Sequence, residues 1–234
     1  MTKIGVILAG GGVGRRFGGE TYKQFVELEG RPVYAWSMAP FLELPEVVQV
    51  VAVVPEGLEP RLLEMAARWF PEMGPELTVV AGGRSRQESV AHGLEALTPE
   101  AEWVAVHDAA RPLVTREMVE ETLFMAQEVG AAAPAIPVAD TVKEVDDSSL
   151  VIRTLDRSRL RLVQTPQVCR RSLLEEAMAA AREQELEATD EAGLLEAVGA
   201  AVAIVEGSRF NLKITHPDDL LLAQALLRCR RDGA

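Results

Sequence analysis

The sequence predicts an α/β protein with a mostly parallel sheet that is covered by helices on both faces. Two observations predict it. Apolar runs typical of strands alternate along the chain with segments of helical periodicity, and the predicted strands are rich in Val, Ala and Ile. Strands of that composition are buried on both sides, as in parallel sheets whose crossover helices lie on the two faces. With 234 residues, 48% of them hydrophobic, the chain is long enough for a single domain over 1–234.

The individual elements follow from this alternation. Several predicted helices also begin at recognisable caps, such as Ser85 with Glu88 three residues later and Thr215 with Pro217. The segment 189–191, Thr-Asp-Glu, is explained in the same way as a cap with acidic residues in the first turn. The predicted strands are 3–9, 48–54, 77–81, 102–107, 131–136 and 200–205, and the predicted helices are 32–42, 58–70, 86–97, 115–129, 170–185, 189–198 and 216–230.

A glycine-rich loop follows the first predicted strand. Four of the five residues in Gly10–Gly14 are glycines, Arg15 and Arg16 come next, and Lys23 follows seven residues after Arg16. Glycines let the backbone approach a ligand closely and point N–H groups at it, and the nearby cations suit a polyphosphate. The loop lacks the Gly-Lys-Ser/Thr ending of a Walker A loop, and Arg15 replaces the third glycine of a Gly-x-Gly-x-x-Gly motif. The alternative is a plain glycine turn, which leaves the three cations unexplained.

Two further loops are expected at the same edge of the sheet. Gly82–Ser89 follows the third predicted strand and His107–Pro112 follows the fourth. The carboxyl ends of parallel strands meet at one edge, where ligands bind. Asp108 is a candidate oxygen ligand for Mg²⁺, and equally a turn-forming residue. Arg111 suits bidentate recognition of phosphate, whereas His107 is interpreted as a packed strand-end residue rather than a base.

One segment, 138–164, departs from the strand–helix alternation. It predicts a hairpin, with apolar residues on either side of a turn at Asp146–Ser149. An isolated two-stranded hairpin is marginally stable in water, so its apolar side chains need a partner surface. We expect a second copy of the chain to supply that surface, which makes the protein a homodimer through the 138–164 arm.

Near the C-terminus, Asn211 and Lys213 stand out because the chain has one asparagine and only four lysines. On a short extended stretch, alternation puts both side chains on the face opposite Leu212 and Ile214. The rarity of lysine favours a functional role for Lys213 over a solvated surface position.

Composition excludes several classes of protein. The net charge of −12 is unlike the basic footprint of a nucleic-acid-binding protein. No stretch approaches the ~20 apolar residues that span a bilayer, and the first residues are unlike a signal peptide, so we expect no membrane contact and a cytoplasmic location. Cys169 and Cys229 are expected to be free thiols.

Taken in order along nearly the whole chain, these motifs resemble the 2-C-methyl-D-erythritol 4-phosphate cytidylyltransferases of the non-mevalonate isoprenoid pathway. The glycine loop is shared by many nucleotidyltransferases, but the ordered set is specific. The resemblance implies a Rossmann-like nucleotidyltransferase fold with a protruding β-arm. The matching segments are 9–16 with 23–24, 82–83 with Ser89, 107–112, 140–143, 156–157, 165–167, 189–191 and 211–215.

The resemblance also implies the reaction and its residues. The reaction would be transfer of a cytidylyl group from CTP to 2-C-methyl-D-erythritol 4-phosphate, with Mg²⁺ on Asp108. Thr141 and Arg157 would come from the arm of a partner subunit. The implied residues are Arg16, Lys23 and Lys213 for catalysis; Ala9, Gly10, Gly11, Gly12, Gly14, Gly83, Ser89 and Ala109 for the nucleotide; and Asp108, Arg111, Thr141, Arg157, Thr165 and Thr189 for the acceptor.

Two alternatives remain open at this point. The first is a sister cytidylyltransferase that acts on ribitol 5-phosphate, against which Ala110 and the segment 189–191 favour the erythritol phosphate. The second is a catalytically silent nucleotide-binding subunit. The joint presence of four charged residues argues against a silent subunit: Arg16, Lys23, Asp108 and Lys213.

Overall fold

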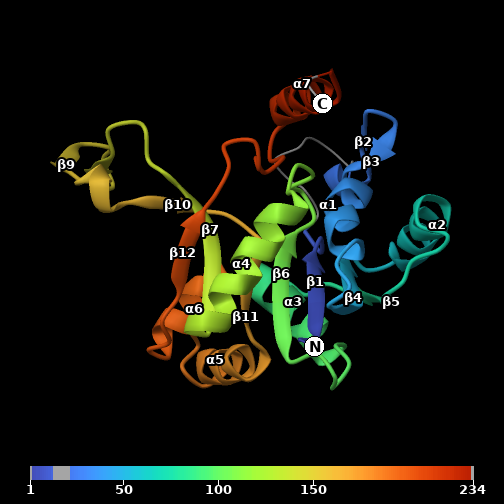
Figure 1. The fold of residues 1–234 in the computed structure, drawn as a ribbon. Helices are drawn as coiled ribbons and strands as arrows, with labels where there is room; N and C mark the ends of the chain where they lie inside the picture. Colours follow the sequence, from blue (N-terminus) through green and yellow to red (C-terminus); the bar gives the residue numbers. More distant parts are fainter. Residues whose placement is uncertain (1, 13–21, 233–234) are drawn as a thin grey trace.

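The computed structural model describes residues 2–12 and 22–232, and an eight-stranded sheet lies at its centre (Figure 1). The strands are β1 (Ile4–Ala9), β4 (Val47–Val54), β5 (Glu76–Ala81), β6 (Trp103–Asp108), β7 (Ala131–Pro137), β10 (Arg161–Val163), β11 (Gln167–Arg170) and β12 (Ala203–Glu206). Their order is β10-β7-β11-β6-β1-β4-β5, and β12 pairs with β7. Six strands run parallel, while β10 and β11 run against their neighbours. The six parallel strands are those that the sequence predicts, which confirms the fold class.

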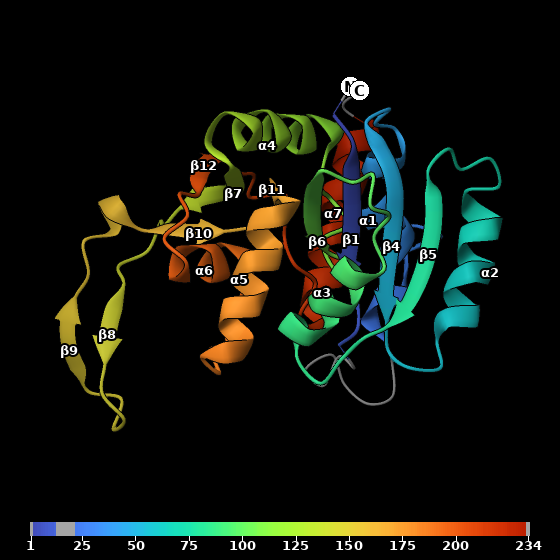
Figure 2. The same cartoon turned by 90° about the horizontal axis from the view of Figure 1, so that it is seen from below.

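Helices cover both faces of this sheet, as predicted (Figure 2). One face carries α1 (Val33–Leu42), α2 (Glu59–Trp69) and α4 (Arg116–Val129). The other carries α3 (Arg86–Glu95), α5 (Arg171–Glu183) and α6 (Glu191–Ala197). The last helix, α7 (Pro217–Asp232), packs instead on a small hairpin of β2 (Glu27–Leu28) and β3 (Arg31–Pro32).

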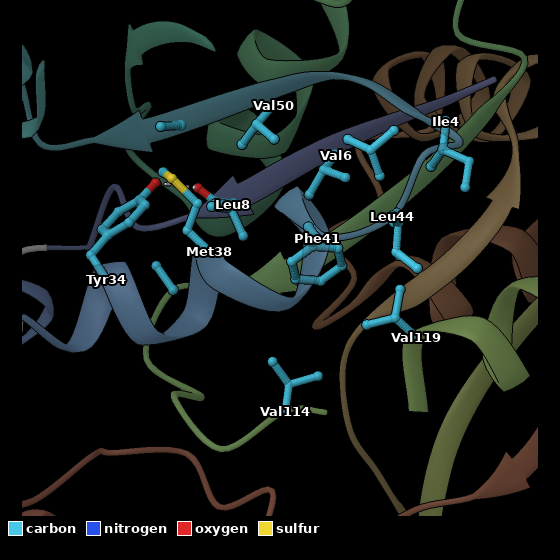
Figure 3. Packing of buried hydrophobic residues seen from close by; sticks show 14 of the residues in the cluster. Ile4, Val6, Leu8, Tyr34, Met38, Phe41, Leu44, Val50, Val114 and Val119 are labelled. Carbon is cyan, nitrogen blue, oxygen red and sulfur yellow. Dashed lines mark hydrogen bonds between the residues drawn. The ribbon is translucent and has the colours of Figure 1, made fainter. Parts of the chain in front are cut away.

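The central strand β1 shows why the predicted strands are apolar throughout. Ile4, Val6 and Leu8 point to one face, where they pack with residues of α1 such as Phe41 (Figure 3). Ile7 points to the opposite face, where it packs with α3 in a second apolar cluster to which α5 and α6 also contribute. Full burial of each such side chain stabilises the fold by about 1.5–3 kcal/mol. Because β1 buries side chains on both faces, it anchors both helical layers.

The helix starts agree with the caps in the sequence, with two corrections. Ser85 Oγ accepts from the Glu88 N–H at the start of α3, as predicted. At α6 the cap is Asp190 rather than Thr189, since the Asp190 carboxylate accepts from the N–H of residue 193. At α7 the carboxylate of Asp219 accepts from the N–H groups of Thr215 and residue 216, so a carboxylate inside the helix replaces the predicted hydroxyl cap.

The predicted hairpin is present as β8 (Lys143–Val145) and β9 (Val151–Thr154), which stand away from the sheet (Figures 1 and 2). Its predicted C-terminal limit was wrong. Residues 161–163 form β10 and pair with β7 inside the main sheet, so the arm ends before Arg161. A short run of three residues with no sequence periodicity of its own gave no signal for this strand.

Two expectations from composition concern cysteines and membranes. Cys169 is buried in β11 and Cys229 is exposed on α7, and both are free thiols, as predicted. Within residues 2–12 and 22–232, no helix is long and apolar enough to cross a membrane.

Candidate active site

A cavity of about 790 Å³ opens at the carboxyl ends of β1, β5 and β6. That volume lies within the usual range for a small-molecule site. The three loops that the sequence assigns to one edge of the sheet do meet here. Ten of the predicted site residues line the cavity: Ala9, Gly10, Gly11, Gly12, Lys23, Gly83, Ser89, Asp108, Ala109 and Lys213.

The glycine loop after β1 has no room for side chains at two positions. A Cβ on Gly10 would lie 2.7 Å from the Val53 carbonyl oxygen, and one on Gly11 would lie 3.0 Å from the Gly82 Cα atom. The Gly10 N–H donates to Val53, and the Gln24 side chain donates from Nε2 to the Gly10 carbonyl at 2.8 Å. The backbone therefore forms the cavity wall itself, as close approach to a ligand requires.

Ser89 holds the second loop, Gly82–Ser89, in shape. Its hydroxyl accepts from the Gly83 N–H at 3.0 Å and donates to the Ser85 carbonyl at 2.8 Å. The Glu88 carboxylate accepts from the Arg84 N–H, so this loop is both a capped helix start and a wall of the cavity. The two interpretations of this loop are therefore compatible.

Asp108 is a buried carboxylate, 5% exposed, at the end of β6. Oδ2 lies 2.9 Å from Lys213 Nζ and 3.3 Å from Arg111 Nε, and Oδ1 lies 3.3 Å from Arg86 Nε. Burial raises the pKa of Asp108, but Lys213, Arg86 and Arg111 lower it well below its usual range overall. Asp108 is therefore a firmly ionised carboxylate inside a ring of cations.

Arg86 connects Asp108 to the start of α6. Its two terminal nitrogens donate to the two carboxylate oxygens of Glu191 at 2.6 and 2.9 Å. Glu191 is 1% exposed. Burial lowers the pKa of the Arg86 guanidinium, but the carboxylates of Glu191 and Asp108 outweigh it and raise the pKa overall. Because Nε and both terminal nitrogens are engaged, Arg86 acts as a fixed bridge between two carboxylates.

Two lysines from distant parts of the chain flank the cavity. Lys23 lies in η2 (Lys23–Phe25) and donates from Nζ to the Ile214 carbonyl at 2.7 Å. Lys213 precedes α7 and reaches Asp108. The segment before α7 is thus tied both to η2 and to the end of β6, and Lys23 and Lys213 both line the cavity.

A buried polar layer lies behind Asp108. The Asp108 N–H donates to Thr165 Oγ1 at 3.0 Å, and that hydroxyl lies 3.0 Å from Nδ1 of His107. His107 is completely buried, and burial lowers its pKa to about 4. It is therefore a neutral, packed residue at neutral pH, as predicted. Asn211 is also buried, and its Nδ2 donates to the Thr165 carbonyl.

The other predicted site residues lie outside the described cavity lining. Arg111 and Thr165 are behind Asp108, Thr189 is exposed just before α6, and Thr141 and Arg157 are exposed on the arm. Gly14 and Arg16 fall in 13–21, outside the described residues.

Sequence reasoning missed three site groups: Gln24, Arg86 and Glu191. Arg86 stands in the predicted second loop and Glu191 in the 189–191 motif, but each is explained locally by a helix start. Two features of the sequence could have indicated them. Arg86 is a cation with no local partner after the double glycine at 82–83, and Glu191 is an acidic residue at the start of a distant helix. Their pairing depends on the tertiary fold.

The fold is that of an α/β nucleotidyltransferase. The sequence profile of the 2-C-methyl-D-erythritol 4-phosphate cytidylyltransferase family matches residues 4–229. The chain belongs to this family. It is 46% identical over 227 residues to the enzyme of that name from Carboxydothermus hydrogenoformans, covering 97% of this chain and 96% of the relative. The resemblance seen in the sequence is thereby confirmed.

Solved structures agree. The 2-C-methyl-D-erythritol 4-phosphate cytidylyltransferase of Thermus thermophilus is 39% identical, with a TM-score of 0.76, and 97% of this chain and 100% of that one are covered. The 4-diphosphocytidyl-2C-methyl-D-erythritol synthase of Anaerococcus prevotii is 27% identical, with a TM-score of 0.85 and coverage of 97% and 99%.

Proposed function

We propose that this protein transfers the cytidylyl group of CTP to 2-C-methyl-D-erythritol 4-phosphate, giving 4-diphosphocytidyl-2-C-methyl-D-erythritol and pyrophosphate. The observation that carries the proposal is the full-length match to the family, together with the cation-rich cavity at the carboxyl edge of the sheet. The acceptor's phosphate attacks the α-phosphorus of CTP, the new P–O bond forms, and the bond to pyrophosphate breaks.

In this proposal the nucleotide lies along the two glycine loops. Ala9–Gly12, with Gly14, would let the triphosphate approach the backbone closely. The Gly10 N–H already donates to Val53, so other N–H groups of this loop would bind the anion. Gly83, Ser89 and Ala109 meet the ribose and the cytosine. The steric limits at Gly10 and Gly11 show that the loop backbone packs directly against Val53 and Gly82, which fixes the loop in place beside the cavity.

Catalysis then depends on charge and position. A phosphate nucleophile is already ionised, so the reaction needs no strong general base, and a neutral buried His107 agrees with that. Lys23, Lys213 and Arg16 would stabilise the charge that develops on the α-phosphate and on the leaving pyrophosphate. Cations held in place before the reaction stabilise that charge without reorganising.

Asp108 is the residue that would hold Mg²⁺. It fits the ion, because Mg²⁺ is usually bound by one or two carboxylates together with substrate phosphates and water. Within residues 2–12 and 22–232 no cluster of three or more acidic, His or Cys side chains forms a cation cage, so Asp108 would share the ion with CTP. When bound, Mg²⁺ would neutralise phosphate charge; Arg86 and Arg111 keep the Asp108 carboxylate in place.

We further propose a homodimer in the cytoplasm, with the arm as its interface. Leu150 and Ile152 on the arm are 66% and 59% exposed. Apolar side chains this exposed on an isolated hairpin are stabilised when another protein surface buries them. Thr141 and Arg157 of the partner subunit would then contact the acceptor. Arg111, Thr165 and Thr189 would contact it from the first subunit.

Product identification tests the proposal. The protein is incubated with CTP, Mg²⁺ and 2-C-methyl-D-erythritol 4-phosphate, and the mixture is analysed by ³¹P NMR. We expect two coupled diphosphate signals from the product and a separate signal from pyrophosphate. Unchanged CTP and acceptor, with a folded protein, would contradict it.

A further inference from the structure

His107, Thr165, Asp108 and Arg111 are joined in one chain of hydrogen bonds behind the cavity. The Asp108 N–H donates to Thr165 Oγ1, which lies 3.0 Å from His107 Nδ1. On the other side of the ring, His107 Nε2 lies 3.2 Å from the carbonyl oxygen of Arg111. The side chains of His107 and Thr165 are both almost fully buried, so water does not complete or replace these bonds.

The chemistry of the partners fixes the direction of every bond. A carbonyl oxygen only accepts, so His107 Nε2 carries a hydrogen and donates it to Arg111. The ring is buried against Phe41, with centroids 5.2 Å apart, and both ring nitrogens face uncharged groups, which favours the neutral form. Nδ1 of a neutral ring with Nε2–H is an acceptor, so the Thr165 hydroxyl donates to it.

This direction uses up the only hydrogen of the Thr165 hydroxyl. One lone pair of Oγ1 already accepts from the Asp108 N–H, which leaves a single lone pair. Toward a substrate, Thr165 can therefore accept a hydrogen bond from a hydroxyl but cannot donate one to a phosphate oxygen.

The same chain fixes the backbone that presents the two charged side chains. The Arg111 N–H donates to the Asp108 carbonyl, and Arg111 Nη1 donates to the Asn211 carbonyl at 2.8 Å. Asn211 Nδ2 in turn donates to the Thr165 carbonyl at 2.9 Å, which closes the ring of contacts. A change at His107 therefore acts on both Asp108 and Arg111 without touching a ligand.

We infer that His107 is a positioning residue, held as the Nε2–H tautomer, and that Thr165 meets the acceptor only as a hydrogen-bond acceptor. Through Thr165 and the Arg111 carbonyl, His107 sets the backbone position from which the Asp108 side chain reaches the cavity and the Arg111 side chain contacts Asp108. The kinetic part of this inference rests on the proposed function, whereas the tautomer does not.

The tautomer is measured first, by ¹⁵N NMR of the ring nitrogens in the full-length protein at neutral pH. The chain has three histidines, and the His107→Gln spectrum identifies the signals of His107 by their loss. We expect a protonated Nε2 and an unprotonated Nδ1. A protonated Nδ1 would overturn the inference even if the enzyme is active, and an inactive enzyme with the expected tautomer would overturn only the proposed function.

Kinetics of matched variants test the positioning role. His107→Gln keeps one donor and one acceptor, while His107→Phe keeps the ring shape and loses both. We expect His107→Phe to lower kcat/KM per folded molecule about 10- to 100-fold, as loss of a supporting contact does, and His107→Gln to recover much of that loss. A purely structural role would lower the melting temperature and leave kcat/KM of the folded protein intact, which would overturn the inference.

Thr165 gives a second pair of variants if His107→Phe fails to fold. Thr165→Val keeps the shape and removes the hydroxyl, and Thr165→Ser restores it. We expect Thr165→Val to be about 10- to 100-fold less active in kcat/KM and Thr165→Ser to be clearly more active than Thr165→Val. Equal activity of a folded Thr165→Val and the wild type would contradict the positioning role, because it would show that the contacts of the Thr165 hydroxyl do not matter for the reaction.

Discussion

The Lys213 ammonium lies 2.9 Å from Asp108 Oδ2, so a cation from the segment before α7 already neutralises the carboxylate at the end of β6. Arg86 and Arg111 approach the same carboxylate at 3.3 Å. The cavity thus holds more positive than negative charge, although the whole chain carries −12. A strongly anionic ligand is the chemistry that this local excess favours.

Removal of either lysine of the cavity should reduce turnover. We expect Lys213→Ala and Lys23→Ala each to lower kcat by at least ~10²-fold, as loss of one preorganised charge does. The matched control is Lys3→Ala, since Lys3 forms an exposed ion pair with Glu100 away from the cavity and should keep wild-type turnover. Steady-state kinetics of pyrophosphate release measure this, and a near-normal kcat in either cavity variant would refute its role.

The Arg86–Glu191 pair should stabilise the fold as well as the site. Breaking a buried ion pair costs about 3–5 kcal/mol, so we expect Glu191→Gln to lower the free energy of unfolding by about 3 kcal/mol, near the lower limit because Asp108 still contacts Arg86. Glu95→Gln is the control: its pair with Arg182 is exposed on both sides and should be worth about 0–1 kcal/mol. Urea denaturation measures both variants, and equal losses of unfolding free energy would show that the Arg86–Glu191 pair is no stronger than an exposed ion pair.

His107 should make stability depend on pH. Its pKa is 6.5 when unfolded and about 4 when folded, so between these values the unfolded chain binds more protons. The stability contribution is complete above pH 6.5 and is lost as the pH falls toward 4. We expect the wild type to lose about 2 kcal/mol more than His107→Gln between pH 7 and pH 5.

Denaturation curves at the two pH values provide the measurement. The other two histidines are present in both proteins, so their contributions cancel in the comparison. The same pH dependence in the wild type and in His107→Gln would show that His107 is not buried as a neutral ring.

The arm should determine both assembly and acceptor use. We expect the double change Leu150→Glu and Ile152→Glu to convert a dimer into a monomer in analytical ultracentrifugation, because charges cannot be buried in an apolar interface. Leu63→Glu, on an exposed position of α2, is the control and should leave the assembly unchanged. A wild-type protein that sediments as a monomer would contradict the dimer.

Arg157, also on the arm, should affect acceptor use. We expect Arg157→Ala to raise KM for the acceptor while KM for CTP stays the same.

Much of the fold could be predicted because its main signal is local. Each of the six parallel strands is an apolar run between helices, and the predicted limits lie within three residues of the structure at every strand end. β10 and β11 could not be predicted in the same way. They are three and four residues long, and β11 inserts between β6 and β7 by pairing across the sheet, which no local pattern encodes.

The candidate site likewise has a part that the sequence predicts and a part that depends on the tertiary fold. The convergence of the three loops follows from a parallel sheet, and the structure brings Gly10, Ser89 and Asp108 together at one cavity as that convergence predicts. The bridge from Arg86 to Glu191 could not be predicted, because each residue has a sufficient local role at a helix start. Only the packed structure brings the two helix starts together and buries the carboxylate.

The assigned reaction and acceptor are both tested by measuring pyrophosphate release from CTP and Mg²⁺, with 2-C-methyl-D-erythritol 4-phosphate and ribitol 5-phosphate compared as acceptors. We expect rapid release with the erythritol phosphate and little with the ribitol phosphate. Release with ribitol 5-phosphate alone would contradict the assigned acceptor, and no release with either would contradict the assigned reaction.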